Sequence, residues 1–328
     1  MEWGDSMIVA KAPLRVTFAG GGSDVAARLH GTVGRVLSMT INVYVYMSVN
    51  RRRDQKVVAA YAHVERVSAS GELHNALIKC ALAHHGIQHG IEVHSIGELP
   101  IDACGMGGSG AAAVALLKAL ERLTGKFRMT SDLAETAAAV EIHDMGRSVG
   151  KQDHYAAAYG GVNEFVFDGE DVHLGFQAAT TPHGPEFLRG KMAFAPCLNG
   201  QRDASLILSD QFRWKSSAGQ DLAEPVGRAV CAYKDRDVDG LISVLRQGWL
   251  VKRTLPGVTT PSAEMIVDRA QELGGGAKLN GAGGGGMVFA LFPTEEITKH
   301  FVSEFDGAFL VNPETRPALV TLDDGERL

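Results

Sequence analysis

The chain has 328 residues, of which 45% are hydrophobic and 21% are charged, values close to those of ordinary globular proteins, which argues against a disordered or coiled-coil chain. Its 32 Lys and Arg residues and 38 Asp and Glu residues give a formal net charge of −6, so the chain lacks the basic excess that neutralises a phosphate backbone. We therefore expect a folded protein that binds no nucleic acid. Glycine is the outlier, because 39 glycines are about 12% of the chain against a usual value of roughly 7%, and the excess gathers in a few short clusters.

The cysteines and the N-terminus bear on the cellular compartment. Cys80, Cys104, Cys197 and Cys231 are too scattered for a zinc knuckle or a dense disulfide framework, and free thiols fit a reducing cytoplasm. Residues 1–11 lack the basic and apolar regions of a secretory signal, and the longest uncharged stretch, residues 103–117, is too short and too rich in glycine to cross a bilayer. We expect a cytoplasmic protein without a membrane partner, and the sequence leaves a homodimer open.

Strands and helices are mixed in the first half of the chain. Every odd position of residues 37–49 is apolar while the even positions are mostly Ser, Thr, Asn and Tyr, and this period of two predicts a half-buried antiparallel strand. Shorter runs predict strands at residues 8–18, 90–96 and 163–167. Helical patterns occupy residues 73–84, 109–123 and 131–145, and the last of these stops at Gly146.

The character of the chain changes after residue 167. Residues 168–190 are polar and contain Gly and Pro, which is typical of a boundary between domains. Residues 204–273 are expected to be mostly helical, and apolar strands are expected at residues 287–291, 308–311 and 318–322. We therefore divide the chain into two domains, residues 1–178 and residues 179–328.

Three glycine clusters mark candidate binding loops: AGGGSD at residues 19–24, GMGGSG at residues 105–110 and GAGGGG at residues 281–286. The last two fit the dinucleotide fingerprint G-x-G-x-x-G, but one runs into a strand and the other is separated from the preceding strand, so a nicotinamide cofactor is not expected. The GMGGSG cluster does open an Ala-rich helix, where backbone N–H groups form a ready site for phosphate. The alternative is an ordinary turn that uses glycine only for positive φ.

Two carboxylates downstream could serve a nucleotide. Glu141 lies inside the helix expected at residues 131–145, and Asp153 follows a glycine-containing turn. Each has a plainer interpretation, because a helical Glu is usually solvated and an acid in a first helical turn favours the helix dipole. Phosphoryl transfer, however, needs oxygen ligands for a metal, donors around the phosphates and an acid that orients or deprotonates the attacking hydroxyl. Ser109, Glu141, the loop at residues 105–110 and Asp153 supply this combination.

Taken in order, the motifs resemble those of the GHMP kinases, which include galactokinase, homoserine kinase, mevalonate kinase and phosphomevalonate kinase. The resemblance is carried by KAPLR at residues 11–15 with GGGSD at 20–24, Pro100 with GMGGS at 105–109, GKQD at 150–153 with YAAAYGG at 155–161, and KLNGAGGGG at 278–286. It covers nearly the whole chain, from about residue 8 to residue 292. Within the superfamily, the first motif, ELH at residues 72–74 and GKQDxYAAAYGG are most similar to the D-glycero-D-manno-heptose 7-phosphate kinases of the heptose-nucleotide pathway.

The resemblance implies an α+β fold of two domains with the active site in the cleft between them. It also implies ATP and Mg²⁺, with the ATP phosphates on Gly105, Met106, Gly107, Gly108, Ser109 and Gly110, and with the metal on Ser109 and Glu141. The catalytic Asp of the family falls on Asp153. The basic residue of its first motif falls on Arg15, which would pair with Asp153 and help neutralise the moving phosphoryl group.

The substrate implied by the resemblance is a small sugar phosphate, phosphorylated at its anomeric hydroxyl for GDP-heptose and for capsule or lipopolysaccharide synthesis. The residues expected to hold the sugar or to shape its site are Lys11, Gly20, Gly21, Gly22, Ser23, Asp24, His74, Arg202, Gly283 and Gly284. Among them, His74 and Arg202 would bind the phosphate of the sugar, with Lys252 and Arg253 as further candidates.

Two departures from the family pattern affect the site. The family usually has two or three serines after its G-L-G, whereas this chain has Gly108, Ser109 and Gly110 and so a single hydroxyl. If the metal ligand were the other serine, the metal would rest on Glu141 and phosphate oxygens. His154 stands where the heptose kinases often have Gln. Two other functions share these motifs: another sugar kinase of the superfamily, such as a fucokinase, and a non-catalytic sugar sensor, against which the acid and the metal ligands argue.

Overall fold

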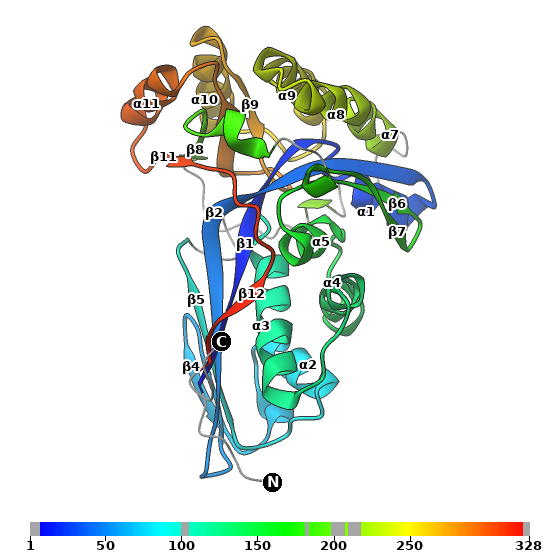
Figure 1. Cartoon of the computed structure of the whole chain (residues 1–328), viewed down its shortest axis with the longest axis vertical. Helices are drawn as coiled ribbons and strands as arrows, with labels where there is room; N and C mark the ends of the chain where they lie inside the picture. Colours follow the sequence, from blue (N-terminus) through cyan, green and yellow to red (C-terminus); the bar gives the residue numbers. More distant parts are fainter. Residues whose placement is uncertain (1–6, 100–104, 181–183, 198–206, 209–217, 324–328) are drawn as a thin grey trace.

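The computed structural model of the chain describes residues 7–99, 105–180, 184–197, 207–208 and 218–323. Its strands form two sheets, and helices pack against each of them (Figure 1). The fold is therefore of the mixed helix and strand kind that the sequence predicts. No helix among the described residues is long and apolar enough to cross a membrane.

The larger sheet has eight strands arranged around β2 (Val33–Arg51). Along one edge β2 pairs antiparallel with β1 (Ile8–Ala19), while β5 (Ile91–Gly97) and β6 (Val162–Asp168) share its other edge. The outer strands are β3 (Val57–Ala60), β4 (Val64–Val67), β7 (Asp171–Gln177) and β12 (Leu319–Asp323). All four strands predicted in the first half of the chain are confirmed.

The expected half-burial of β2 holds for only part of its length. From Val43 to Val49 the odd residues are buried and the even ones are partly exposed, as the period of two predicts. From Val36 to Ile41 every residue is buried. Along this part of the strand the segment around Pro313 runs antiparallel beside β2: the N–H of Glu314 donates to the carbonyl of Thr40, and the Thr40 hydroxyl donates to the carbonyl of Glu314 at 2.6 Å.

The helices beside the larger sheet lie on one of its faces in Figure 1. They are α2 (Ala76–His84), α3 (Gly108–Thr124), α4 (Thr130–Ala139) and α5 (Gln152–Tyr159), while α1 (Ser23–His30) follows β1. The helix predicted at residues 131–145 is α-helical only as far as Ala139, where α4 ends. A π-helical turn, Val140–Asp144, continues it and carries Glu141. The helix predicted from residue 73 begins later, at Ala76, because a 3-10 turn precedes it and Asn75 accepts a capping hydrogen bond from the N–H of Ile78.

The smaller sheet has the strand order β11-β8-β10-β9. Its strands are β8 (Met192–Cys197), β9 (Gly276–Leu279), β10 (Gly286–Leu291) and β11 (Phe309–Val311). The helices of this half are α7 (Ala218–Ala223), α8 (Val226–Lys234), α9 (Val238–Lys252), α10 (Pro261–Glu272) and α11 (Glu295–Glu304). These elements lie together at one end of the molecule (Figure 1).

Two features complicate a division of the chain at residue 178. β7 forms within the polar stretch expected to be a boundary, and it extends the larger sheet by pairing with β6. β12 returns from the end of the chain to pair antiparallel with β1. The larger sheet therefore contains residues of both predicted domains, and the exact division stays a prediction.

Candidate active site

The glycine loop at residues 105–110 runs directly into α3. Gly107 precedes the helix with a φ of 79°, and Gly105 also has a positive φ, so the loop uses glycine for its backbone conformation. The first N–H groups of α3 lack partners within the helix, which makes this end suited to an anion. The positive φ values alone would fit the plain turn equally well.

The loop packs against Asp153 with no room for side chains. A Cβ at Gly107 would lie 3.0 Å from the carboxyl carbon of Asp153, and one at Gly110 would lie 2.8 Å from its Cβ. Gly110 is inside α3, so its lack of a side chain serves this approach rather than a turn. The predicted phosphate loop and the predicted catalytic acid are therefore in van der Waals contact.

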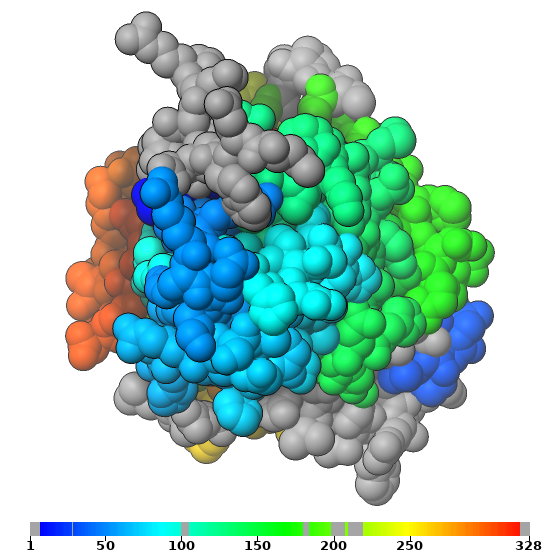
Figure 2. All heavy atoms as spheres, turned by 90° about the horizontal axis from the view of Figure 1, so that it is seen from below, coloured from blue at the N-terminus to red at the C-terminus, as the bar shows by residue number. Residues whose placement is uncertain are grey.

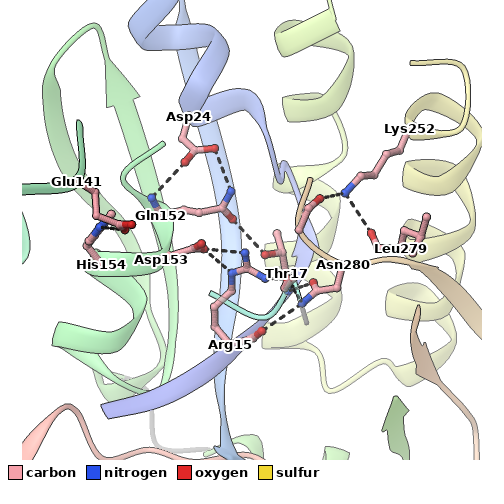
Figure 3. Close-up of polar contacts among 12 residues, drawn as sticks. Arg15, Thr17, Asp24, Glu141, Gln152, Asp153, His154, Lys252, Leu279 and Asn280 are labelled. Atoms are coloured by element: carbon pink, nitrogen blue, oxygen red, sulfur yellow. Dashed lines mark hydrogen bonds and ion pairs between the residues drawn. The ribbon is translucent and has the colours of Figure 1, made fainter. Parts of the chain in front are cut away.

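Arg15 connects the acid to the loop. Its Nε and Nη2 both donate to Oδ1 of Asp153 at 2.7 Å, while its Nη1 donates to the carbonyl of Gly105 at 3.1 Å (Figure 3). The backbone N–H of Arg15 also donates to the carbonyl of Met106, a residue buried in the core. The Arg15 side chain is 3% exposed and that of Asp153 is 30% exposed, so the carboxylate faces the open side of the pair.

Asp24 is buried beside α5 and held by Gln152. It accepts hydrogen bonds from the backbone N–H of Gln152 at 3.1 Å and from its side-chain amide at 3.0 Å. Burial raises the pKa of Asp24, although the hydrogen bond from the Gln152 backbone acts in the opposite direction. The Gln152 amide oxygen in turn accepts from the hydroxyl of Thr17 at 3.1 Å, so a chain of hydrogen bonds joins α1, α5 and β1.

Ser109 and Glu141, the predicted metal ligands, are in contact. The Ser109 hydroxyl donates to Oε1 of Glu141, and Arg147 Nη1 donates to both groups, at 2.8 Å to Ser109 Oγ and 2.6 Å to Glu141 Oε1. His154 Nε2 lies 2.8 Å from the other carboxylate oxygen. Burial by itself would raise the pKa of Glu141, but the hydrogen bonds from His154 and Ser109 and the charge of Arg147 lower it to about 2.

The loop after β9 forms the opposite wall. A Cβ at Gly281 would lie 2.5 Å from the carbonyl oxygen of Gly105, so the second and third glycine clusters touch through backbone. The Asn280 side chain accepts from the N–H of Thr17 at 3.3 Å and donates to the carbonyls of Arg15 and Gly105. Lys252 Nζ donates to the carbonyls of Leu279 and Gly281 (Figure 3). Elements of both sheets therefore close around one cavity.

Most of the predicted site residues line this cavity. They are Arg15, Gly21, Gly22, Asp24, Gly105, Gly107, Gly108, Ser109, Glu141 and Asp153, joined by Arg147, Gln152, His154, Lys252 and Gly281 among others. Sequence reasoning missed Arg147, Thr17 and Asn280. Asn280 lies within a quoted motif, so its position was a usable signal, whereas nothing in the sequence marks Arg147.

Four other predicted residues have structural contacts outside the cavity lining. Gly20 allows close approach, because a Cβ there would lie 1.8 Å from the carbonyl oxygen of Arg35. The Ser23 hydroxyl bonds to the backbone of Arg35 as both donor and acceptor. Gly283 and Gly284 pack on the segment around Val258, and the N–H of Gly284 donates to its carbonyl at 2.7 Å.

Two further predicted substrate residues, Lys11 and His74, do not line the cavity. The ammonium of Lys11 lies over the ring of Tyr44, 4.0 Å from its centroid. His74 is exposed just before α2, where its backbone N–H donates to Glu65. Figure 1 places α2 at the end of the molecule away from the smaller sheet, and the view of that end in Figure 2 shows the segment from β2 to α2, in blue and cyan, at the surface. Arg202 lies outside the described residues.

Comparisons with known proteins bear on the family of the chain. The family descriptions "GHMP kinases N terminal domain" and "GHMP kinases C terminal" match residues 72–161 and 229–306. The chain is 27% identical over 175 residues to a D-glycero-alpha-D-manno-heptose 7-phosphate kinase of Campylobacter jejuni, with 49% of this chain and 50% of that protein covered. It is 27% identical over 221 residues to a mevalonate kinase of Thermococcus onnurineus, with 63% and 61% covered. The chain thus spans about half to three fifths of the length of these relatives.

A solved structure shows the same fold. The crystal structure of a D-glycero-D-manno-heptose 1-phosphate kinase from Bacteriodes thetaiotaomicron superimposes with a TM-score of 0.75 at 21% identity, over 95% of this chain and 97% of the other. Members of the matched family are phosphotransferases that act on hydroxyl groups of sugars or mevalonate. Through its two matching domains and this fold, the chain belongs to the GHMP kinase family.

Proposed function

We propose that the protein is an ATP- and Mg²⁺-dependent sugar kinase that converts D-glycero-D-manno-heptose 7-phosphate to the 1,7-bisphosphate, for GDP-heptose and surface polysaccharide synthesis. The observation that carries the kinase part is the contact between the glycine loop at the start of α3 and Asp153, with Arg15 bonded to both. Phosphoryl transfer needs hydrogen-bond donors around the phosphates and, close to them, an acid that orients the attacking hydroxyl. The contact between the glycine loop and Asp153 brings these two groups together.

The acid would act through one of its two oxygens. Both contacts from Arg15 end on Oδ1, so we assign Oδ2 of Asp153 to the substrate hydroxyl. As the hydroxyl oxygen bonds to the γ-phosphorus, the bond to the β-phosphate oxygen breaks, ADP leaves, and the hydroxyl proton passes to Asp153. Arg15 keeps the carboxylate oriented throughout and places positive charge beside the transferred group.

The residues present fit a magnesium site. Mg²⁺ prefers oxygen ligands and is commonly held by one or two carboxylates together with phosphates, so that it neutralises charge on the phosphate oxygens. Ser109 and Glu141 offer a hydroxyl and a carboxylate in contact, and the low pKa of Glu141 keeps the carboxylate ionised at neutral pH. Both side chains lie at the glycine loop or against it, on the side where the phosphates would lie.

The sugar assignment rests on the heptose kinase likeness. Gly21, Gly22 and Asp24 line the cavity beside Asp153, and we assign them to the hydroxyls of the sugar. His74 lies elsewhere, and two cations of the cavity lining, Arg15 and Arg147, contact Asp153 and the Ser109–Glu141 pair. We therefore assign Lys252, which also lines the cavity, to the phosphate of the sugar. The mevalonate kinase likeness makes mevalonate the competing acceptor.

A phosphoryl-transfer assay on the purified full chain tests this function. The acceptors are the heptose 7-phosphate, the heptose 1-phosphate, the unphosphorylated heptose, fucose and mevalonate, each with ATP and Mg²⁺, and ³¹P NMR locates the new phosphate. We expect the heptose 7-phosphate to give the highest kcat/KM and a product phosphorylated at the anomeric carbon. A higher kcat/KM with fucose or mevalonate would replace the substrate, and binding without turnover of any acceptor would favour the sugar sensor.

A further inference from the structure

Arg147 occupies the position between the two side chains that the proposed function assigns to the metal. One nitrogen, Nη1, lies 2.8 Å from Ser109 Oγ and 2.6 Å from Glu141 Oε1. A cation bound by Ser109 and Glu141 would use the same oxygen lone pairs. The guanidinium and a metal ion therefore compete for one place.

Burial explains why Glu141 carries a cation here. The residue is 2% exposed, and an ionised carboxylate taken out of water is costly unless charged or hydrogen-bonding groups compensate it. Arg147 satisfies Oε1 and His154 satisfies Oε2. A metal on Oε1 would compete with Arg147 for that oxygen, whereas a metal on Oε2 would compete with His154.

The surroundings of the two partners show which one is exchangeable. His154 is 1% exposed and lies within α5, next to Asp153, so its position is fixed by the core. The Arg147 side chain is 28% exposed, comes from the loop between the π-helical turn and α5, and lines the cavity. Arg147 can turn into the cavity while His154 keeps the carboxylate in place.

We propose that Arg147 is a resident cation of the Ser109–Glu141 pair, which a divalent metal displaces only when it arrives together with the nucleotide. A metal arriving alone would have to remove Arg147 from its carboxylate and leave both positive charges in the same part of the cavity. The phosphates of a nucleotide supply the negative charge that pairs with the displaced guanidinium. The nucleotide in this inference rests on the proposed function, whereas the competition itself is a property of Ser109, Glu141 and Arg147.

The test is Mn²⁺ binding to the nucleotide-free full chain, followed by electron paramagnetic resonance of the free ion. Arg147→Gln removes the charge and should tighten Mn²⁺ binding by roughly tenfold or more. Arg147→Lys keeps the charge and should bind Mn²⁺ as weakly as the wild type. The control Arg228→Gln removes an exposed arginine paired with Glu224 and should change nothing. Adding Glu141→Gln to Arg147→Gln should abolish the gain, which locates the ion.

Equal or weaker Mn²⁺ binding by Arg147→Gln would overturn the proposal and make Arg147 a support of the ligand pair. A gain that survives Glu141→Gln would overturn it as well. Thermal unfolding establishes that each variant is folded before binding is measured.

A second measurement uses the wild type and does not depend on the folding of Arg147→Gln. The side-chain Nε–H signal of Arg147 is assigned in NMR spectra by its loss in Arg147→Lys. We expect the signal to shift with Mg²⁺ plus a non-hydrolysable ATP analogue and to stay unchanged with Mg²⁺ alone. An unchanged signal in the presence of both, or a shift with Mg²⁺ alone, contradicts the proposal. Neither experiment requires phosphoryl transfer, so an inactive protein with the Arg147 effect refutes only the kinase function, and an active kinase without it refutes only this inference.

Discussion

Asp153 is the side chain that accepts the hydroxyl proton in the proposed reaction. Asp153→Asn keeps the size of the side chain but cannot accept a proton, so kcat should fall by at least about a hundredfold. The KM for ATP should change little, because the glycine loop is unaltered. Steady-state kinetics with the heptose 7-phosphate measure both.

A matched carboxylate controls for the loss of an ion pair. Asp54→Asn breaks an exposed pair with Arg52, as Asp153→Asn breaks the pair with Arg15, and it should leave turnover unchanged. Circular dichroism checks that Asp153→Asn is folded, because Arg15 is buried and loses its carboxylate partner. Near-normal turnover in folded Asp153→Asn would remove Asp153 from the mechanism.

Ser109 provides the test of the metal position at the same scale. Ser109→Ala removes the hydroxyl that contacts Glu141, so the Mg²⁺ concentration for half-maximal activity should rise by roughly tenfold. Ser303→Ala, which removes a hydroxyl bonded to the His300 carbonyl on α11, serves as the control. If the Mg²⁺ dependence of Ser109→Ala matches that of the wild type, the metal ligand lies elsewhere.

At the scale of elements, the approach of α3 to α5 determines where Asp153 lies. A glycine-to-alanine change inside a helix usually stabilises it by about 0.5–1 kcal/mol. Gly110→Ala should not show this gain, because its Cβ would lie 2.8 Å from the Cβ of Asp153 and would push α5 away. Because Asp153 would move with α5, kcat should fall by about tenfold to a hundredfold.

Gly248→Ala is the matched control for this change. Gly248 is a helical glycine of α9 with open space beside it, since no heavy atom apart from the adjoining backbone of its own helix would lie within 4 Å of an added Cβ. We expect Gly248→Ala to raise the free energy of unfolding in urea and to leave kcat unaltered. A Gly110→Ala variant that is more stable and fully active would show that α3 does not constrain Asp153.

At the scale of the whole molecule, Lys278 joins the two sheets. This residue of β9 is buried, and its Nζ donates to the carbonyl of Phe18 in β1 at 3.1 Å. Burial, together with the charge of Arg15, lowers the pKa of Lys278 to about 7 from its ordinary value of 10.5. At a pH between these two values, the amine of Lys278 is protonated in the unfolded chain and neutral in the folded chain.

The free energy of unfolding should therefore rise with pH across that window. Because the unfolded state binds the extra proton, Lys278 contributes up to about 1.4 kcal/mol per pH unit above about pH 7, and no slope below it, where both states are protonated. Lys278→Met should flatten this dependence in urea unfolding at about pH 7, 8 and 9. The exposed Lys79→Met is the control, and equal slopes for Lys278→Met and the wild type would contradict the burial of a neutral amine.

The elements predicted best are those with strong local patterns. The period of two in β2 and the alanine run of α3 identify a strand and a helix without reference to the rest of the chain. β3, β4 and β9 were missed because four residues carry too little periodicity. β7 was missed although Val172, Leu174 and Phe176 alternate with less apolar residues, because it lies within the stretch 168–190 that was interpreted as a domain boundary. Such strands form because neighbours already in the sheet offer hydrogen bonds, which is a tertiary effect.

The sequence by itself determined the motifs, their order and the kinds of side chain available for chemistry, because these are local properties of the chain. Only the tertiary structure decided which of those side chains share a cavity. Arg15 and Asp153 are 138 positions apart, and Thr17 and Asn280 are 263 apart, so their contacts depend on how β1, α5 and the loop after β9 pack together. The same packing leaves His74 at the far end of the molecule and brings Arg147, which no motif marks, onto Ser109 and Glu141.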